Sequence, residues 1–232
     1  MQMQAVILAA GRGTRMGELT RTTPKALLKV AGKTLLEHKL ECLPDDVEEV
    51  IIVIGYLGNV IRESIGNSYH GKRIVYVEED NPVGGTAHSL WKAKTLLKDK
   101  FLVMNGDNIY ARHDIAECAK YEWAMLVEEK ENLGYAAHVV VDKQGNVIDV
   151  VENQEITSGA GFANTGLYTL DTRIFNYPPV PKSPDSSELG LPQNMMRAAK
   201  NIATKAVYAT SWIQIKSPDD LKRAEEELKN LA

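Results

Sequence analysis

The first half of the chain alternates short apolar runs with segments whose apolar residues recur at helical spacing. Residues 5–10 read Ala-Val-Ile-Leu-Ala-Ala, the length and composition of a buried strand. Leu35, Leu36, Leu40 and Leu43 recur instead at the spacing of one helix face. The pattern predicts strands at 4–9, 50–54, 73–77 and 101–104, and helices at 34–43, 59–65 and 86–97. Strands that alternate with helices are typical of a parallel sheet with helices on both faces.

After Tyr121 the pattern changes, because strand-like runs follow one another with few helices between them. We expect strands at 123–128, 135–141, 147–151 and 162–170. Residues 142–146, Asp-Lys-Gln-Gly-Asn, have the composition of a hairpin turn. Residues 177–187 are rich in Pro and Ser and indicate a loop, and 191–200 a helix. We therefore expect a Rossmann-like α/β fold whose mostly parallel sheet becomes mixed, with antiparallel strands, in its second half.

The end of the chain carries a clear helix start. Ser217 is a good N-cap, Pro218 suits the first turn, and two acids follow where the helix dipole favours them. An amphipathic helix should run from there to about residue 231. The 232 residues show no internal repeat or low-complexity tract, which predicts a single domain over 1–232 with a substantial core.

Composition excludes several classes of protein. With 44% hydrophobic and 25% charged residues and a net charge of −4, the chain is an ordinary globular protein and no dedicated nucleic-acid binder. Cys42 and Cys118 lie in helix-like segments and are too few for a disulfide framework, so we expect both in the core. No apolar run approaches ~18 residues, and the N-terminal run has no basic flank. We expect a cytoplasmic protein without a membrane partner.

The stretch after the first strand is the most informative part of the sequence. Residues 8–16 read Leu-Ala-Ala-Gly-Arg-Gly-Thr-Arg-Met, and the stretch continues to residue 28. It lies at the carboxyl end of a strand, where open α/β sheets bind ligands. Gly11 and Gly13 allow backbone N–H groups to approach a phosphate closely. The stretch also carries four cations suited to a polyphosphate: Arg12, Arg15, Arg21 and Lys25.

Two other phosphate-binding loops do not fit this stretch. The Gly-Lys-Ser/Thr of a P-loop is absent. The dinucleotide fingerprint requires a third glycine where Met16 stands, and no acid for a ribose follows the second predicted strand. A NAD-dependent enzyme is therefore disfavoured.

Residues 8–28 resemble the signature of the sugar-phosphate nucleotidyltransferases, also called sugar-nucleotide pyrophosphorylases: L-A-A-G-x-G-T-R-[LM], then P-K-x-L. Later landmarks follow in family order, so the resemblance covers essentially the whole chain: Gly84-Gly85-Thr86-Ala87, Asn105-Gly106-Asp107, Glu152, Asn164-Thr165-Gly166 and Trp212-Ile213-Gln214-Ile215. It implies the nucleotide-diphospho-sugar transferase type of fold. The nucleotide-binding part should cover about 1–121 and the acceptor-binding part about 122–232.

The resemblance implies a reaction between an NTP and a sugar 1-phosphate that gives an NDP-sugar and pyrophosphate. Such chemistry depends on positioning and charge neutralisation. Arg15 would contact the leaving β- and γ-phosphates, and Lys25 the α-phosphate or the incoming oxygen. The implied nucleotide site also includes the following residues: Leu8, Ala10, Gly11, Gly13, Thr14, Gly85 and Thr86.

A magnesium site is expected at Asp107. This residue follows the apolar strand 101–104 and Gly106, at the carboxyl edge of the sheet, and Mg²⁺ prefers a few protein oxygens plus phosphate and water. In the family this position holds the metal. A second Asp near the end of the family pattern is Gln214 here, whose neutral amide would hold Mg²⁺ less strongly.

The sequence indicates less clearly which residues would contact the base and the acceptor. Many relatives place a Gln upstream of the Gly-Thr-Ala segment to contact the base, where this chain has Glu78-Glu79-Asp80, so base choice stays open. His88 could contact the nucleotide or be structural. For the acceptor the resemblance indicates Gly134, Glu152 and Asn164.

One departure from the family affects the acceptor phosphate. The frequent Glu-Lys-Pro is Glu152-Asn153-Gln154 here, so the lysine that would bind the acceptor phosphate is missing. Lys216 stands two residues after Gln214, on the same face of an extended segment. We hypothesise that Lys216 supplies the missing cation.

Two alternatives follow from these departures. A cytidylyltransferase for a phosphorylated alcohol such as phosphocholine would share the N-terminal loop. A non-catalytic regulatory domain that binds a nucleotide sugar would tolerate the changes at Asn153 and Gln214, although it would have no need of Arg15, Lys25 and Asp107 together. A homo-oligomer is compatible with the sequence, but no surface pattern reveals the oligomeric state.

Overall fold

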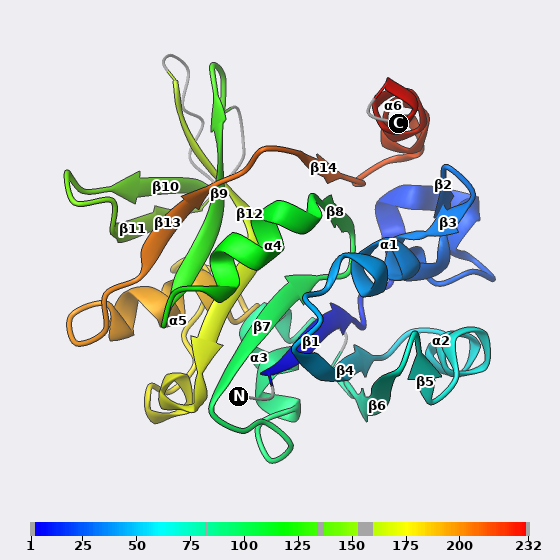
Figure 1. Ribbon diagram of the computed structural model, residues 1–232, viewed down its shortest axis with the longest axis horizontal. Coiled ribbons are helices and arrows are strands. Elements are labelled where there is room, and N and C mark those ends of the chain that lie inside the picture. The colour runs from blue at the N-terminus through cyan, green and yellow to red at the C-terminus, as the bar shows by residue number, and fades with distance from the viewer. Residues whose placement is uncertain (1–2, 82, 134–136, 153–159, 231–232) are drawn as a thin grey trace.

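A computed structural model describes residues 3–81, 83–133, 137–152 and 160–230. Its main feature is a ten-stranded sheet in the order β11-β10-β12-β7-β1-β4-β6-β5, with β9 and β13 joined beside β12 (Figure 1). The four strands predicted in the first half are confirmed: β1 (Met3–Ala9), β4 (Val47–Ile54), β6 (Lys72–Glu78) and β7 (Lys100–Asn105). They pair in parallel as β7-β1-β4-β6.

The second half of the sheet is mixed, as expected. Its strands are β9 (Ala124–Lys130), β10 (His138–Val141), β11 (Val147–Val151), β12 (Gly161–Asp171) and β13 (Lys205–Tyr208). β12 pairs antiparallel with β7, and β10 and β11 form the predicted hairpin. β13 pairs in parallel with β9. The predicted strand at 135–141 is described only from residue 137 onward.

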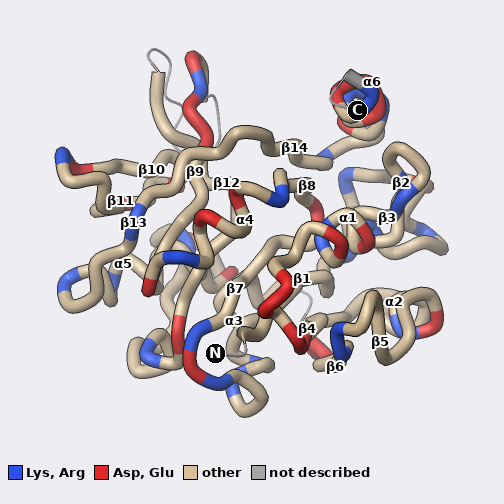
Figure 2. The backbone as a smooth tube through the Cα atoms, viewed as in Figure 1, with Lys and Arg blue, Asp and Glu red and all other residues tan. Residues whose placement is uncertain are grey.

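Helices cover both faces of the sheet because successive residues of β1 point to opposite sides. Ala5 and Ile7 pack with α1 (Leu35–Cys42), α2 (Gly58–Ile65) and α4 (Arg112–Ala119). Val6 packs on the other side, with α3 (Gly85–Lys92) and α5 (Leu191–Ala198). The central strands β1, β7 and β12 are almost wholly tan in Figure 2, because only Lys100 and Asp171 at their ends carry charge.

Smaller elements complete the fold near the C-terminus. Helix α6 (Pro218–Asn230) packs against the short hairpin of β2 (Lys29–Val30) and β3 (Lys33–Thr34) and against β14 (Trp212–Gln214). β14 pairs antiparallel with β8 (Asn108–Tyr110), and β5 (Ser68–Tyr69) lies at the sheet edge beyond β6. Within the described residues, no helix is both long and apolar enough to cross a membrane.

Two predictions are corrected by the structure. The helix expected over 86–97 ends at Lys92, because tight i to i+3 turns follow it, although Ala93 and Leu97 remain buried on the same apolar face. Cys118 is buried in α4 as expected, but Cys42 is only half-buried at the end of α1; both are free thiols.

Candidate active site

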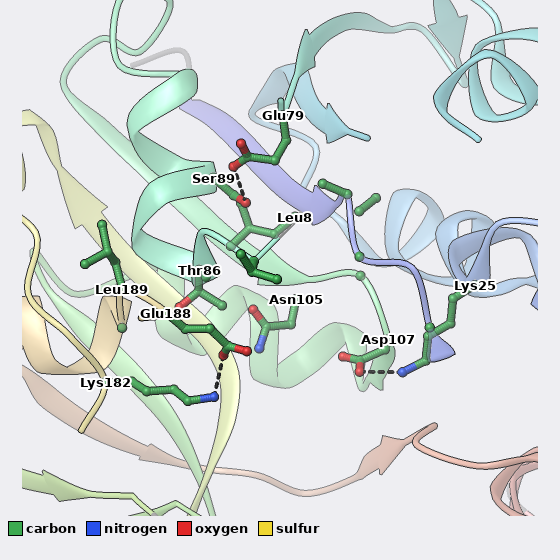
Figure 3. Close-up of a pocket in the computed structure, with 18 of the residues that line it drawn as sticks. Leu8, Lys25, Glu79, Thr86, Ser89, Asn105, Asp107, Lys182, Glu188 and Leu189 are labelled. Atoms are coloured by element: carbon green, nitrogen blue, oxygen red, sulfur yellow. Dashed lines mark hydrogen bonds and ion pairs between the residues drawn. The ribbon is translucent and has the colours of Figure 1, made fainter. Parts of the chain in front are cut away.

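A cavity of about 560 Å³ lies at the carboxyl ends of β1, β6 and β7 (Figure 3). It is bounded by the loop after β1, the turn after β7 and the N-terminus of α3, and by residues from the second half of the sheet. All eight predicted nucleotide-site residues line it: Leu8, Ala10, Gly11, Gly13, Thr14, Arg15, Gly85 and Thr86. The position at the strand ends is the one expected of an α/β ligand site.

The loop after β1 directs only some of its cations to the cavity. Gly13 adopts a left-handed φ of 63° just before the 3-10 helix η1 (Thr14–Thr20), and a Cβ there would lie 3.1 Å from Cβ of Lys25. Arg15 and Lys25 line the cavity. Arg12 instead lies over the Tyr56 ring, 5.1 Å from its centroid. Half of the predicted phosphate-binding cations are thus in place, since Arg21 is also directed elsewhere, to exposed Glu18.

Lys25 and Asp107, 82 residues apart in sequence, form an ion pair at the cavity wall. Lys25 Nζ lies 2.7 Å from Asp107 Oδ2, and the two side chains are 13% and 26% exposed. The Gly106 N–H donates to the Leu8 carbonyl at 2.9 Å, and the Ile215 N–H donates to the Asp107 carbonyl at 3.0 Å. The turn after β7 is therefore held against both β1 and the C-terminal segment.

The N-terminus of α3 is packed closely against the segment that precedes α5. Gly85 has a φ of 84°, and a Cβ there would lie 2.5 Å from the Leu189 carbonyl oxygen. Thr86 Oγ1 accepts a hydrogen bond from the Leu191 N–H at 3.0 Å. Gly85 and Thr86 therefore join the two halves of the fold as well as lining the cavity.

Of the three acidic residues at 78–80, Glu79 lines the cavity. Its side chain is only 2% exposed. Oε2 lies 2.8 Å from His88 Nδ1 and accepts from Ser89 Oγ at 3.0 Å, while Oε1 accepts from the Asn81 N–H at 2.9 Å. His88 is therefore bound to Glu79 and is not among the residues that line the cavity.

The second half of the chain supplies the opposite wall of the cavity. Three residues predicted to bind the acceptor, Glu152, Asn164 and Lys216, line it. Asn164 Nδ2 donates to the hydroxyl of buried Tyr168 at 2.9 Å, and burial raises the pKa of Tyr168. Burial also raises the pKa of the Glu152 carboxyl, against the opposing charge of Lys182. Predicted acceptor residue Gly134 and the departure at 153–154 lie outside the described residues.

Sequence reasoning missed the contribution of the Pro- and Ser-rich loop. Lys182 and Glu188 form an ion pair at the cavity wall (Figure 3), and Gln193 of α5 lines the cavity beside them. The sequence showed residues 177–187 only as a loop. Nothing in their spacing indicates the cavity, because the segment that follows the loop is placed by hydrogen bonds of Leu189 with Gly84 and Ala87, about a hundred residues earlier.

Lys216 lines the cavity, whereas Gln214 does not. Burial lowers the pKa of Lys216, the charge of Arg15 lowers it further, and the charge of Asp107 raises it, so this ammonium lies on the side of the cavity lined by Arg15 and Asp107. Gln214 pairs with Asn108 across β14 and β8, and lines a neighbouring hollow together with Trp212. The structure does not bring Gln214 into the cavity with Asp107.

Comparison with known proteins agrees with this geometry. The nucleotidyl transferase family model matches residues 4–230. The chain is 30% identical over 223 residues to the bifunctional protein GlmU of Methanocaldococcus jannaschii, covering 96% of this chain and 53% of that protein. It is 30% identical over 244 residues to the UTP–glucose-1-phosphate uridylyltransferase AglF of Haloferax volcanii, covering 97% and 96% of the two chains.

A solved structure shares the fold at full length. The CTP:phosphocholine cytidylyltransferase of Streptococcus pneumoniae is 25% identical, with a TM-score of 0.74 and coverage of 98% of this chain and 100% of that one. The chain spans about half the length of the GlmU relatives. The protein belongs to the nucleotidyltransferase family, and its resemblance to the sugar-phosphate branch is confirmed.

Proposed function

We propose that this protein transfers a nucleotidyl group from an NTP to a sugar 1-phosphate, forming an NDP-sugar and releasing pyrophosphate. One observation carries the proposal: a single cavity unites the glycine-rich loop after β1 with Glu152 and Asn164 from the second half of the sheet. Similarity at nearly full length to a UTP–glucose-1-phosphate uridylyltransferase supports the sugar acceptor.

The charges of the cavity support two phosphorylated substrates. Four cations line it: Arg15, Lys25, Lys182 and Lys216. Lys25 and Lys182 are neutralised by Asp107 and Glu188, whereas Arg15 and Lys216 form no salt bridge among the described residues. Cations that lack an internal partner are available to phosphate oxygens.

The proposed reaction needs no covalent intermediate with the protein. A phosphate oxygen of the acceptor attacks the α-phosphorus of the NTP, and a new P–O bond forms. The bond between the α-phosphorus and the oxygen that bridges to the β-phosphate breaks, and pyrophosphate leaves with the electron pair. Arg15 would bind the β- and γ-phosphates, and Lys25 would neutralise charge that builds on the α-phosphoryl oxygens.

The donor set at the turn after β7 fits Mg²⁺. The Asp107 carboxylate lines the cavity, and so does Asn105, whose Oδ1 has no hydrogen-bond partner among the described residues. These are oxygen donors of the kind Mg²⁺ prefers. When bound, Mg²⁺ would neutralise the phosphates of the NTP. Gln214, the other proposed ligand, lines the neighbouring hollow, so the magnesium proposal depends on Asp107.

The acceptor proposal depends on the wall formed by the second half of the sheet. Glu152 and Asn164 present oxygen and amide groups suited to sugar hydroxyls, and Gly134 is proposed by resemblance alone. Lys216 is proposed to bind the acceptor phosphate, because its ammonium lies near Arg15 and Asp107.

A second candidate is a cytidylyltransferase that acts on a phosphorylated alcohol. The similarity in fold and sequence to the phosphocholine enzyme of Streptococcus pneumoniae favours it, as does the absence of a lysine at Asn153. Because the two candidates share the nucleotide loop, the acceptor distinguishes them.

Pyrophosphate release tests both candidates. Each common NTP is combined with Mg²⁺ and a panel of sugar 1-phosphates and phosphorylated alcohols. We expect one NTP and one sugar 1-phosphate to release pyrophosphate together. Asp107→Asn should lower kcat roughly 100-fold or more, because the metal contributes several kcal/mol of charge stabilisation.

The matched control is Asp149→Asn, which removes an exposed carboxylate on β11 away from the cavity and should leave kcat unchanged. Release with a phosphorylated alcohol alone would establish the second candidate. No release from any pair, together with binding of a nucleotide sugar, would replace both with the regulatory hypothesis.

A further inference from the structure

Lys39 is a buried cation beneath the turn that carries Asp107. It lies in the last turns of α1, on the face formed by Leu35, Leu36 and Leu40, and is 1% exposed. The face of a helix that packs against a sheet is normally apolar. A lysine at that position is costly, because a buried ammonium loses its hydration.

The Lys39 side chain reaches from α1 to the turn after β7. Its Nζ donates to the Leu35 carbonyl at 3.0 Å and to the Gly106 carbonyl at 2.9 Å. Within the described residues, no carboxylate lies at salt-bridge distance from it. Burial lowers the pKa of Lys39 to about 7, Asp107 raises it, and Lys25 lowers it again.

The Gly106 carbonyl belongs to the peptide plane that leads into Asp107. Gly106 has no side chain that could fix this plane, and a Cβ there would lie 2.6 Å from the Leu8 carbonyl oxygen. The hydrogen bond from Lys39 holds the carbonyl, and with it the direction in which the Asp107 side chain leaves the backbone. The ion pair of Asp107 with Lys25 depends on that direction.

Stability alone does not account for a lysine at this position. Even a buried ion pair can often be replaced by well-packed apolar groups of similar volume without loss of stability, and a buried ammonium without a carboxylate partner is costlier than a paired one. The turn is also held without Lys39, through the N–H groups of Gly106 and Ile215. Lys39 adds a hydrogen bond that fixes the orientation of the peptide plane between Gly106 and Asp107, next to the Asp107 carboxylate.

We propose that Lys39 is a positioning residue, which holds the Gly106 carbonyl so that the Asp107 carboxylate faces Lys25 and the cavity. The proposal rests on the proposed nucleotidyl transfer for its kinetic consequence, but not for its structural one. It is independent of which base and which acceptor the protein uses.

The test compares two lysine-to-methionine variants. Lys39→Met keeps the length and shape of the side chain but removes the donor. Lys72→Met is the matched control, because Lys72 Nζ also donates to two backbone carbonyls, of Pro44 and Val47, but lies away from the cavity. Denaturant unfolding, steady-state kinetics and a crystal structure are obtained for each.

Lys39→Met should be at least as stable as the wild type and yet lose roughly 100-fold in kcat, with both KM values little changed, because a misplaced catalytic group lowers the rate of the chemical step. Lys72→Met should keep its kcat. In the crystal structure, Asp107 of Lys39→Met should turn away from Lys25. Lys39→Gln, which retains a shorter donor, should recover part of the lost rate.

Three results would overturn the proposal. They are wild-type kcat in Lys39→Met, a loss of activity that only follows a loss of stability, and an unmoved Asp107 in the variant structure. If Lys39→Met does not fold, Lys39→Gln takes its place in the same comparisons. If the wild type transfers no nucleotide, the proposed function fails, and the position of Asp107 in the variant still decides whether Lys39 positions it.

Discussion

The cations of the glycine-rich stretch after β1 differ in direction: Arg15 and Lys25 line the cavity, whereas Arg12 and Arg21 contact other side chains. Arg12 and Arg21 satisfy the same sequence pattern as Arg15, yet they bind a tyrosine ring and an exposed carboxylate. Lys216, almost two hundred residues later, stands at the cavity in their place. A count of cations in a loop therefore overestimates how many of them line the cavity, because neighbouring side chains decide where each cation points.

Lys216→Met should weaken binding of the acceptor. A hydrogen bond to a charged group contributes about 1.5–3 kcal/mol, so we expect the acceptor KM to rise roughly 10- to 100-fold while the NTP KM stays near its wild-type value. The measurement is steady-state kinetics with each substrate varied in turn.

Lys130→Met is the control for this prediction, because Lys130 lines the neighbouring hollow, lies 5.0 Å from the Trp212 ring centroid, and does not line the cavity. An unchanged acceptor KM in Lys216→Met would contradict the role given to Lys216. Lys182, which is paired with Glu188, would then be the next cation to replace.

At the scale of elements, the junction between α3 and the segment before α5 is a close backbone contact at the cavity. Gly85→Ala should destabilise the protein by about 2–3 kcal/mol, because the residue has a φ of 84° and a Cβ would meet backbone at 2.5 Å. Gly145→Ala shares the positive φ but has open space, so it should cost only about 1–2 kcal/mol. Denaturant unfolding of both variants measures the difference, and equal losses would refute the role of the contact.

Elements with a local sequence pattern could be predicted, whereas elements that depend on distant partners could not. The local pattern of apolar residues predicts the four parallel strands and α1, and α1 also has a capping box between Thr34 and Glu37. The pairing of β14 with β8 depends on a partner about a hundred residues away, and so do the hydrogen bonds of Leu189 with Gly84 and Ala87, which place the segment after the loop at 177–187. Lys182 and Glu188 were missed for that reason, whereas Asp107 was found because it directly follows a predicted strand.

At the scale of the whole molecule, the cavity exists because β12 pairs antiparallel with β7 and so joins the second half of the sheet to the first. The loop after β1 and the wall formed by Glu152 and Asn164 then line the same cavity as Asp107. Lys39 lies under this junction and is 1% exposed. A pKa that differs between the folded and the unfolded protein makes the free energy of unfolding depend on pH.

The pH dependence of stability tests this linkage. The pKa of Lys39 is about 7 in the folded protein and near 10.5 when the chain is unfolded. Below pH 7 both states bind the proton and the cost of burying the charge is fully present. Between pH 7 and 10.5 the unfolded state binds more protons, so the stability of the wild type rises with pH, by up to about 1.4 kcal/mol per unit.

Lys39→Met lacks this titration, while Asp107, Lys25 and Cys42, whose charges act on Lys39, are present in both proteins. Near pH 7 the variant should therefore be the more stable of the two. Its advantage should shrink by roughly 1 kcal/mol per pH unit up to pH 9. Denaturant unfolding of both proteins at pH 7, 8 and 9 measures the difference. A constant difference would mean that Lys39 has the same pKa in both states, and that its ammonium is compensated in the folded protein.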